Sequence, residues 1–230
     1  MQSAFGRAAA VYLAAFLLSV PPLPAKDPVR AKHGMVNAQE PIAADVGLAV
    51  LKSGGNAVDA AIAVGFVLAV THPVAGNIGG GGFMLVRLAN GRTAFLDFRE
   101  CAPRKATRDM YIGPDGEATK DSIFGWRSPG VPGSAAGFEE AYKEFGSKPW
   151  AELVRPSVQL ARNGFVVSEP FADSLRSAQK MLASDAESNR IFLRDGNLYK
   201  PGETFKQPEL AGTLERIADR GAKGFGSSGR

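Results

Sequence analysis

The sequence is poor in the residue types that most often build metal and redox sites. Its 230 residues include one cysteine and two histidines. The single Cys101 forbids an internal disulfide, and neither His33 nor His72 has a second histidine, cysteine or carboxylate at metal-ligand spacing. We therefore expect both histidines to be structural, and Cys101 to be a small buried hydrophobic residue instead of a nucleophile.

Clustered charge is also missing from the sequence. The 27 Lys and Arg residues exceed the 23 Asp and Glu residues only slightly, and no run of five like charges occurs. Aromatic residues make up 9% of the chain and do not alternate with basic ones. Because nucleic-acid binding needs a basic cluster and base-stacking aromatics, the sequence gives it little support.

The first 25 residues have the organisation of a secretory signal peptide, and their apolar run is too short for a membrane helix. Arg7 supplies a basic start, residues 8–20 are almost wholly apolar, and residues 23–25 offer small side chains for cleavage. We expect a cleaved signal, a secreted or periplasmic protein and no stable membrane span; an uncleaved anchor is the alternative. Cleavage leaves 26 basic and 23 acidic residues.

The four consecutive glycines at 79–82 lack the context of a nucleotide-binding loop. No Lys-Ser or Lys-Thr follows them, and they precede an apolar run that reads as a strand instead of opening a helix. They either let the backbone pack tightly or adopt unusual φ, or their amides line a pocket. Ser53, Ser128 and Ser134 lack the G-x-S-x-G context of an activated nucleophile.

Two apolar runs, 83–88 and 93–98, flank Asn90-Gly91 and predict a β-hairpin with a two-residue type I′ turn. Neither run alternates cleanly between apolar and polar residues, so we expect both faces of the hairpin to be covered. In the predicted register Leu88 faces Thr93, Leu85 faces Leu96, and Phe83 faces Phe98.

Arg99 leaves the second predicted strand beside Asp97 and Glu100. One interpretation is a structural ion pair with one of these acids or another. The other is a binding site, because a guanidinium is a planar fork of donors that fits a carboxylate bidentately and stays charged at physiological pH. Spacing does not separate the two interpretations. The residues thus indicate a possible anion clamp and no nucleophile.

Capping and periodicity predict most of the other elements. Asn56 caps a helix at 57–70 with Asp59 three residues later, and this helix is apolar nearly all round, so we expect it to be buried. The long loop 103–133 should be functional or partly structured. The remaining predicted segments are a strand at 33–37, helices at 41–52, 134–145, 150–163, 169–186 and 208–220, an extended piece at 165–167, and a small hairpin of 191–193 with 198–199.

Several blocks, in order, resemble the γ-glutamyltranspeptidase (glutathione hydrolase) family. The resemblance covers roughly residues 31–225, and the succession of blocks makes it far more specific than any single motif. The blocks are NAQEPIAA from Asn37, LKSGGNAVDAAIA from Leu51, GGGGFM from Gly79, LDFRECAP from Leu96, WRSPGVPGS from Trp126 and LARNGF from Leu160.

The resemblance implies an α/β Ntn-hydrolase-like αββα sandwich, incomplete in this chain, with two stacked sheets between helical layers. It implies a proenzyme that cleaves itself, so that the new N-terminal threonine of the small subunit is the nucleophile and its own amine the base. The γ-glutamyl group of glutathione or a related amide then passes to threonine and on to water or an amino acid. The arginine that grips the α-carboxylate of the substrate corresponds to Arg99. No metal or organic cofactor is implied.

In this family the threonine and the other substrate contacts lie later in the sequence, so residues 26–230 resemble the N-terminal portion of the large subunit. The final GFGSSGR also departs from the family pattern. We therefore expect a fragment, a truncated gene or a frameshifted product that is inactive by itself and partners a small subunit of the same precursor. The alternatives are a cephalosporin acylase or capsule-processing transpeptidase of the same fold, and a non-catalytic remnant.

Overall fold

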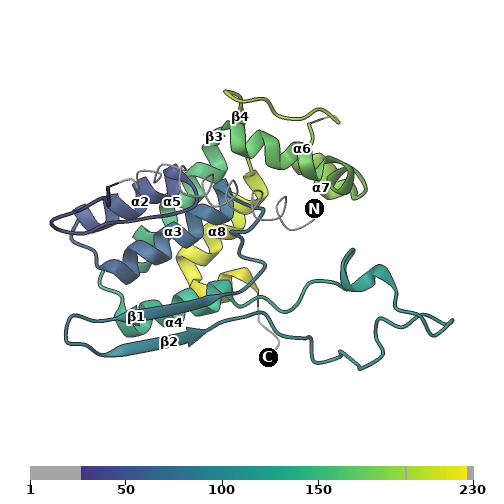
Figure 1. The fold of residues 1–230 in the computed structure, drawn as a ribbon, viewed down its shortest axis with the longest axis horizontal. Helices are drawn as coiled ribbons and strands as arrows, with labels where there is room; N and C mark the ends of the chain where they lie inside the picture. Colours follow the sequence, from purple (N-terminus) through teal and green to yellow (C-terminus); the bar gives the residue numbers. More distant parts are fainter. Residues whose placement is uncertain (1–26, 195, 227–230) are drawn as a thin grey trace, which may run out of the picture. The chain divides into compact units, whose positions relative to one another are not determined.

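The computed structural model describes residues 27–194 and 196–226 (Figure 1). The predicted signal peptide, residues 1–25, lies outside the described residues. The chain divides into two units, residues 1–34 and 35–230, and the second carries every helix and strand of the described chain. The predicted strand at 33–37 is wrong, because these residues form bends and coil and no described segment pairs with them.

Helix α2 (Pro41–Lys52) has the predicted bounds. Its first turn is fixed by Glu40, whose carboxylate accepts a hydrogen bond from the Ala43 N–H at 3.1 Å, and by a proline at the first helical position. The helix ends at Ser53, and Gly54 follows with φ 89°, a conformation that glycine adopts without steric cost.

Helix α3 (Ala57–Thr71) begins with the capping pair that the sequence predicts. The Asn56 side chain accepts hydrogen bonds from the N–H groups of Val58 and Asp59, and the Asp59 carboxylate accepts one from the Asn56 N–H at 2.9 Å. The predicted burial of this helix is also confirmed. Ten of its residues are buried and cover more than half of its circumference, while Ala57 and Ala61 on the remaining side are exposed.

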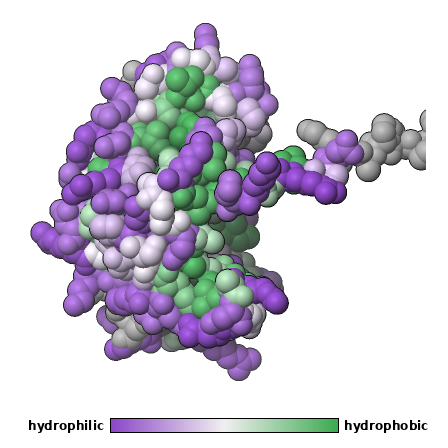
Figure 2. All heavy atoms as spheres, turned by 90° about the vertical axis from the view of Figure 1, so that its left-hand side faces the viewer, coloured by the Kyte–Doolittle hydropathy of each residue, from purple (hydrophilic) through white to green (hydrophobic). Residues whose placement is uncertain are grey.

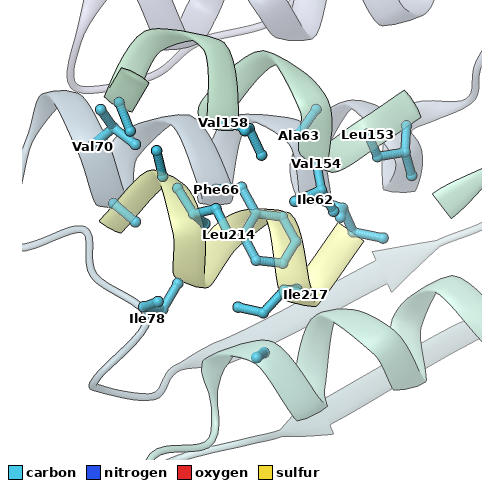
Figure 3. Packing of buried hydrophobic residues seen from close by; sticks show 14 of the residues in the cluster. Ile62, Ala63, Phe66, Val70, Ile78, Leu153, Val154, Val158, Leu214 and Ile217 are labelled. Atoms are coloured by element: carbon cyan, nitrogen blue, oxygen red, sulfur yellow. The ribbon is translucent and has the colours of Figure 1, made fainter. Parts of the chain in front are cut away.

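The main core forms where helix α5 (Trp150–Asn163) packs against both α3 and helix α8 (Pro208–Arg220). The Trp150 indole N–H donates to the Ile217 carbonyl at 2.8 Å and so fastens α5 to α8. Helix α5 stays continuous across Pro156. Figure 3 shows the apolar side chains that these helices direct toward one another, among them Ile62, Phe66, Val154, Val158, Leu214 and Ile217.

Strands β1 (Phe83–Arg87) and β2 (Thr93–Asp97) form the predicted hairpin, but the predicted register is wrong by one residue. The turn accounts for the difference. The Gly91 N–H donates to the Leu88 carbonyl, the Leu88 N–H donates to Arg92, and Gly91 has φ 86°. This is a three-residue loop, a turn followed by a left-handed glycine, instead of the predicted two-residue turn. The observed pairs are Phe83 with Asp97, Met84 with Leu96, Leu85 with Phe95, Val86 with Ala94, and Arg87 with Thr93.

The prediction that both faces of this hairpin are covered is wrong for the part of the chain that the structure describes. One face packs on the core, and Val86 there is 7% exposed. The other face, which we call the open face, consists of Phe83, Leu85 and Phe95, and they are 58%, 76% and 64% exposed. Hydrophobic residues are also exposed elsewhere on the surface. Figure 2 shows such areas, in green, bordered by hydrophilic residues in purple.

Helix α4 (Ser134–Phe145) has the predicted bounds and contacts strand β2. The loop before it is partly structured, as predicted. It contains the 3-10 helix η1 (Lys120–Ser122) and isolated β-bridges, one of which joins Ile112 to Ala118.

A second group of aromatic side chains surrounds Phe205, which is fully buried. Phe205 lies in strand β4 (Thr204–Phe205), which pairs with strand β3 (Phe165–Val166). The rings of Phe165, Phe171, Phe192 and Tyr199 all contact the Phe205 ring.

The predicted helix at 169–186 is two helices, α6 (Glu169–Ala183) and α7 (Ala186–Phe192). They separate where Asp185 caps α7 by accepting a hydrogen bond from the Ser188 N–H. The predicted strand at 191–193 is therefore wrong, since its first two residues are helical. The 3-10 helix η2 (Gly221–Phe225) follows α8. Within the described residues, no helix combines the length and the apolar composition needed to cross a bilayer.

Candidate functional site

Arg99 is the first residue beyond the paired backbone of the hairpin. Phe98 and Gly82 exchange two backbone hydrogen bonds, of 3.0 and 3.3 Å, directly before it. The Arg99 N–H then donates to the side chain of Asp97 at 3.0 Å. Hydrogen bonds thus fix the backbone of Phe98 and the N–H of Arg99. They limit the directions in which the Arg99 side chain can leave the strand.

The Arg99 side chain is 57% exposed. One terminal nitrogen lies 3.3 Å from a carboxylate oxygen of Glu100, and the guanidinium carbon lies 6.0 Å from the centre of the Phe83 ring. An exposed pair of this kind contributes about 0–1 kcal/mol, so it steers the guanidinium without locking it away from solvent. The acid that pairs with the side chain is Glu100, while Asp97 binds the backbone. The contact with Glu100 fits the ion-pair interpretation of Arg99, and the exposure of the side chain fits the binding-site interpretation.

The Glu100 carboxylate has one exposed side and one buried side. Its second oxygen, Oε2, is buried and has no hydrogen-bond partner among the described residues. Gly81 and Gly130 lie on either side of this side chain: a Cβ added at Gly81 would lie 2.6 Å from Oε2, and one at Gly130 would lie 3.2 Å from the Glu100 Cβ and Cγ. Glycine at both positions makes room for Glu100.

Within the glycine-rich segment, residues 79–82, the structure supports tight backbone packing, the first of the interpretations given above. A Cβ added at Gly81 would lie 2.5 Å from the Glu100 N and would overlap the Phe98 carbonyl oxygen. The carbonyl of Gly80 accepts hydrogen bonds from the N–H groups of Gly133 and Ser134, at 2.8 and 3.1 Å. The segment therefore joins the end of the hairpin to the first turn of α4.

Two further glycines support Phe98 from α4. Gly133 is the N-cap of the helix, and Gly137 lies one turn later. A Cβ added at Gly133 would overlap the Phe98 carbonyl, and one added at Gly137 would overlap the Cβ and Cγ of Phe98. Sequence reasoning missed both residues. Their four-residue spacing was visible, but nothing local to it indicated which side chain would pack there.

Aromatic contacts connect this site to the core. The Phe98 ring, 7% exposed, meets the Phe138 ring edge-on at 5.6 Å, and Phe138 meets Phe66 of α3 edge-on at 5.1 Å. Edge-to-face pairs at such distances are favourable beyond the area that they bury. Arg99 is thus one residue away from a side chain that belongs to the packed interior.

The prediction that Cys101 is buried is wrong, because Cys101 is exposed. It exchanges two backbone hydrogen bonds with Val131, of 3.3 and 2.8 Å. This bridge lies where the loop leaves and rejoins the fold, so the thiol faces outward instead of into the core.

Of the other polar residues that the sequence singled out, His72 and the three serines have local hydrogen bonds. His72 ends α3, and its carbonyl accepts hydrogen bonds from the N–H groups of Ala75 and Gly76. His33 lies in the coil before α2. Residues 27–194 and 196–226 contain no group of three or more His, Cys, Asp or Glu side chains that could hold a metal ion. The hydroxyls of Ser53, Ser128 and Ser134 each donate to a backbone carbonyl.

A groove of about 860 Å³ lies beside the same loop, although Arg99 does not line it. Prolines and alanines form much of its wall, and Arg104, Glu139 and Lys223 bring charge to it. Arg99 itself is outside this groove, and its side chain is 57% exposed at the end of the hairpin, where an anion from solvent or from another segment can reach it.

Comparison with known sequences gives a consistent result. A family model described as gamma-glutamyltranspeptidase matches residues 43–229. The chain is 48% identical over 200 residues to the glutathione hydrolase proenzyme of Escherichia coli (strain K12), which is 86% of this chain and 34% of that protein. The chain thus spans about a third of the length of the curated relatives it matches.

Comparison with solved structures agrees. The gamma-glutamyltranspeptidase of Helicobacter pylori superposes with a TM-score of 0.84 at 43% identity, covering 86% of this chain and 58% of that one. The cephalosporin acylase of Bacillus halodurans superposes with a TM-score of 0.77 at 28% identity, covering 91% of this chain and 40% of that one. These neighbours confirm the predicted Ntn-hydrolase-like α/β fold class.

Proposed function

Because the chain belongs to the γ-glutamyltranspeptidase family, we propose that Arg99 binds the α-carboxylate of a γ-glutamyl donor such as glutathione. The observation that carries this proposal is the exposed guanidinium at the end of β2, held on one side by Glu100. A guanidinium engaged through one terminal nitrogen keeps further N–H donors, and two parallel donors match the two oxygens of a carboxylate.

We propose that the protein carrying this chain transfers a γ-glutamyl group to water or to an amino acid. The attacking group would be the N-terminal threonine of a second subunit, released by cleavage of a common precursor, and that threonine would lie outside residues 27–226. The E. coli relative is named a proenzyme, which supports processing. Arg99 would hold the amino-acid end of the donor so that its γ-amide reaches the nucleophile, a contribution of orientation and not of bond-making.

The open face of the hairpin supports a further layer in the complete protein. Phe83 and Phe95 stack at 5.7 Å on that face, and Leu85 is 76% exposed beside them. A contiguous apolar patch of this kind is typical of a surface that another element covers. The second sheet of the fold is the proposed cover. Residues 1–25, with their basic start and apolar middle, support export of the protein to the periplasm or the outside.

The acylase alternative has weaker support. The chain is 28% identical to the cephalosporin acylase and 48% identical to the glutathione hydrolase proenzyme, so the γ-glutamyl donor is the better-supported substrate class. No described contact of Arg99 favours a donor without an α-carboxylate.

The experiment compares two probes that differ only in the α-carboxylate. L-glutamine is a γ-amide of glutamate, and L-glutaminamide has an amide in place of the α-carboxylate. We expect the 230-residue chain to bind L-glutamine more tightly, and Arg99→Lys to weaken that binding about 10- to 100-fold, since a charge-assisted bidentate contact contributes about 1.5–3 kcal/mol. Isothermal titration calorimetry measures both affinities.

Arg92→Lys is the matched control. Arg92 is another exposed arginine of the hairpin, paired with Glu144 at 2.9 Å and similar in exposure to Arg99. It should leave the affinity for L-glutamine unchanged. Equal affinity for the two probes, or equal effects of the two arginine variants, would contradict the proposal and return Arg99 to the ion-pair interpretation.

A further inference from the structure

We infer that Gly133 and Gly137 of α4 are positioning residues, which set the direction of the Arg99 guanidinium through the backbone of Phe98. The inference rests on the proposed function of Arg99 and says which part of the fold makes its side chain ready to receive a carboxylate. The atoms nearest to a Cβ added at Gly133 or Gly137 belong to Phe98 and to the backbone of Arg99, not to the guanidinium.

The contacts at Phe98 cannot be relaxed by turning a side chain. At Gly133 an added Cβ would overlap the carbonyl oxygen of Phe98 and would lie 2.8 Å from its carbonyl carbon. At Gly137 an added Cβ would overlap the Cβ and Cγ of Phe98 and would lie 2.5 Å from Cδ1. Backbone atoms, Cβ and Cγ do not move when the ring rotates about χ2. An alanine at either position therefore forces the backbone of Phe98 or the start of α4 to move.

The start of α4 is the more firmly anchored of the two. Its first N–H groups bind the Gly80 carbonyl, and the Ser134 hydroxyl donates to the Asn77 carbonyl at 3.2 Å. Further along the helix, the Phe138 ring packs on Phe66, which is fully buried. Moving α4 would disturb all of these contacts together, and close-packed interiors resist such shifts. The displacement should fall on residues 98–99.

The same displacement reaches the guanidinium. Arg99 follows Phe98 directly, its N–H is bound to Asp97, and its side chain is steered by Glu100 and the Phe83 ring. Bidentate binding of a carboxylate needs both N–H vectors to be aligned, so a shift of the arginine backbone costs part of the charge-assisted contact. Loss of alignment at Arg99 should therefore appear as weaker binding of the α-carboxylate, with the rest of the ligand unaffected.

The test observes Arg99 directly by nuclear magnetic resonance. The Nε–Hε signal of Arg99, assigned from its loss in Arg99→Lys, is followed in the 230-residue chain with and without L-glutamine or L-glutaminamide. Gly137→Ala is compared with Gly47→Ala. Gly47 is a buried residue of α2, and its added Cβ would lie 2.6 Å from Cγ2 of Val64 and 2.9 Å from Cγ1 of Val36, so this control crowds side chains other than Phe98 and Phe138.

We expect Gly137→Ala to shift the Arg99 signal in the free chain and to weaken binding of L-glutamine about tenfold, with binding of L-glutaminamide unchanged. Gly47→Ala should change neither, although both variants crowd neighbouring side chains. The inference is wrong if the two alanine variants give the same Arg99 signal in the free chain. If the wild type does not distinguish the two ligands, the proposed function fails, while the signal of the free chain still decides the inference.

A milder variant serves if Gly137→Ala does not fold. Phe98→Leu keeps Cβ and Cγ but removes the ring that packs against Phe138. It should broaden or shift the Arg99 signal and weaken L-glutamine binding several-fold. Phe66→Leu, a change in the core at a residue without a direct link to Arg99, is its control. Equal Arg99 signals in Phe98→Leu and Phe66→Leu would overturn the inference.

Discussion

Asp59 joins the start of α3 to the segment after α4, and replacing it tests how the core is held. The residue is fully buried. One carboxylate oxygen accepts the N–H groups of Ser147 and Lys148, and the other accepts the Asn56 N–H and the Ser147 hydroxyl. Asp59→Asn keeps the shape of the side chain but replaces one of the two acceptor oxygens by an N–H₂ donor. The substitution therefore tests the hydrogen bonds to the carboxylate without creating a cavity.

The expected loss is about 3 kcal/mol. The hydroxyl of Ser147 can turn to accept a hydrogen bond from the new amide, but the N–H of either Asn56 or Ser147 then faces another donor. A stranded buried donor costs about 1–3 kcal/mol, and hydrogen bonds to a neutral acceptor are weaker than those to a charged one. For a chain of this size, 3 kcal/mol corresponds to a decrease in Tm of about 6–12 °C.

The loss should also depend on pH. Burial raises the pKa of Asp59, but hydrogen bonds from the Ser147 hydroxyl and from the backbones of Asn56, Ser147 and Lys148 outweigh it and hold the pKa below its usual 3.8. A depressed pKa contributes stability that is present above the unfolded-state pKa and is lost as the pH falls through the folded-state pKa. The difference between wild type and Asp59→Asn should therefore be constant between pH 5 and about pH 8 and should shrink below about pH 4.

Thermal unfolding followed by circular dichroism across this pH range measures the effect. Asp45→Asn is the control, because Asp45 is an exposed carboxylate on α2 and should change Tm by no more than about 1 °C. If Asp59→Asn unfolded at the wild-type temperature at pH 7, or if its loss were the same at pH 3 and pH 7, the reasoning about this carboxylate would be refuted.

Two further predictions concern packing and the open face. The side chain of Gln207, which is 5% exposed, donates to the Val70 carbonyl at 2.9 Å, one of the last carbonyls of α3. Gln207→Leu should lower the free energy of unfolding, measured in urea, by about 1–3 kcal/mol. A decrease of less than about 0.5 kcal/mol would contradict this role of the hydrogen bond. Leu85→Lys should change the stability of this chain by about 0.5 kcal/mol or less and reduce self-association in light scattering. Val86→Lys, on the opposite face of the same strand, should unfold the chain, and equal effects would mean that the open face is covered.

The sequence was most informative where the deciding interaction is local. Asn56 and Asp59 lie three residues apart and predict the start of α3, because the two partners of a capping box are close in the chain. The end of α2 is local in the same way, because Gly54, with positive φ, follows it almost directly. The boundary between α6 and α7 is not evident from the sequence, because an aspartate such as Asp185 fits the interior of a continuing helix as well as the cap of a new one.

The candidate site shows where sequence reasoning ends. The residue type and position of Arg99 pointed to an anion clamp, yet the choice between Glu100 and Asp97 as its ionic partner depends on side-chain geometry that spacing does not give. The exposure of Cys101 depends on its bridge to Val131, thirty residues away. The support of Phe98 by Gly133 and Gly137 joins segments that no local pattern connects. Contacts between distant segments had to come from the structure.

The three-residue loop at 89–91 has a consequence for how this protein can vary. Surface loops ordinarily tolerate changes of length. Here the loop also fixes which residues of the hairpin point inward, since successive side chains of a strand alternate between its two sides. Deleting Ala89 would favour a tighter turn and a shifted pairing of the strands, which would tend to exchange the roles of Val86 and Leu85. Natural variants of this hairpin should therefore differ at its tip in residue type far more often than in residue number.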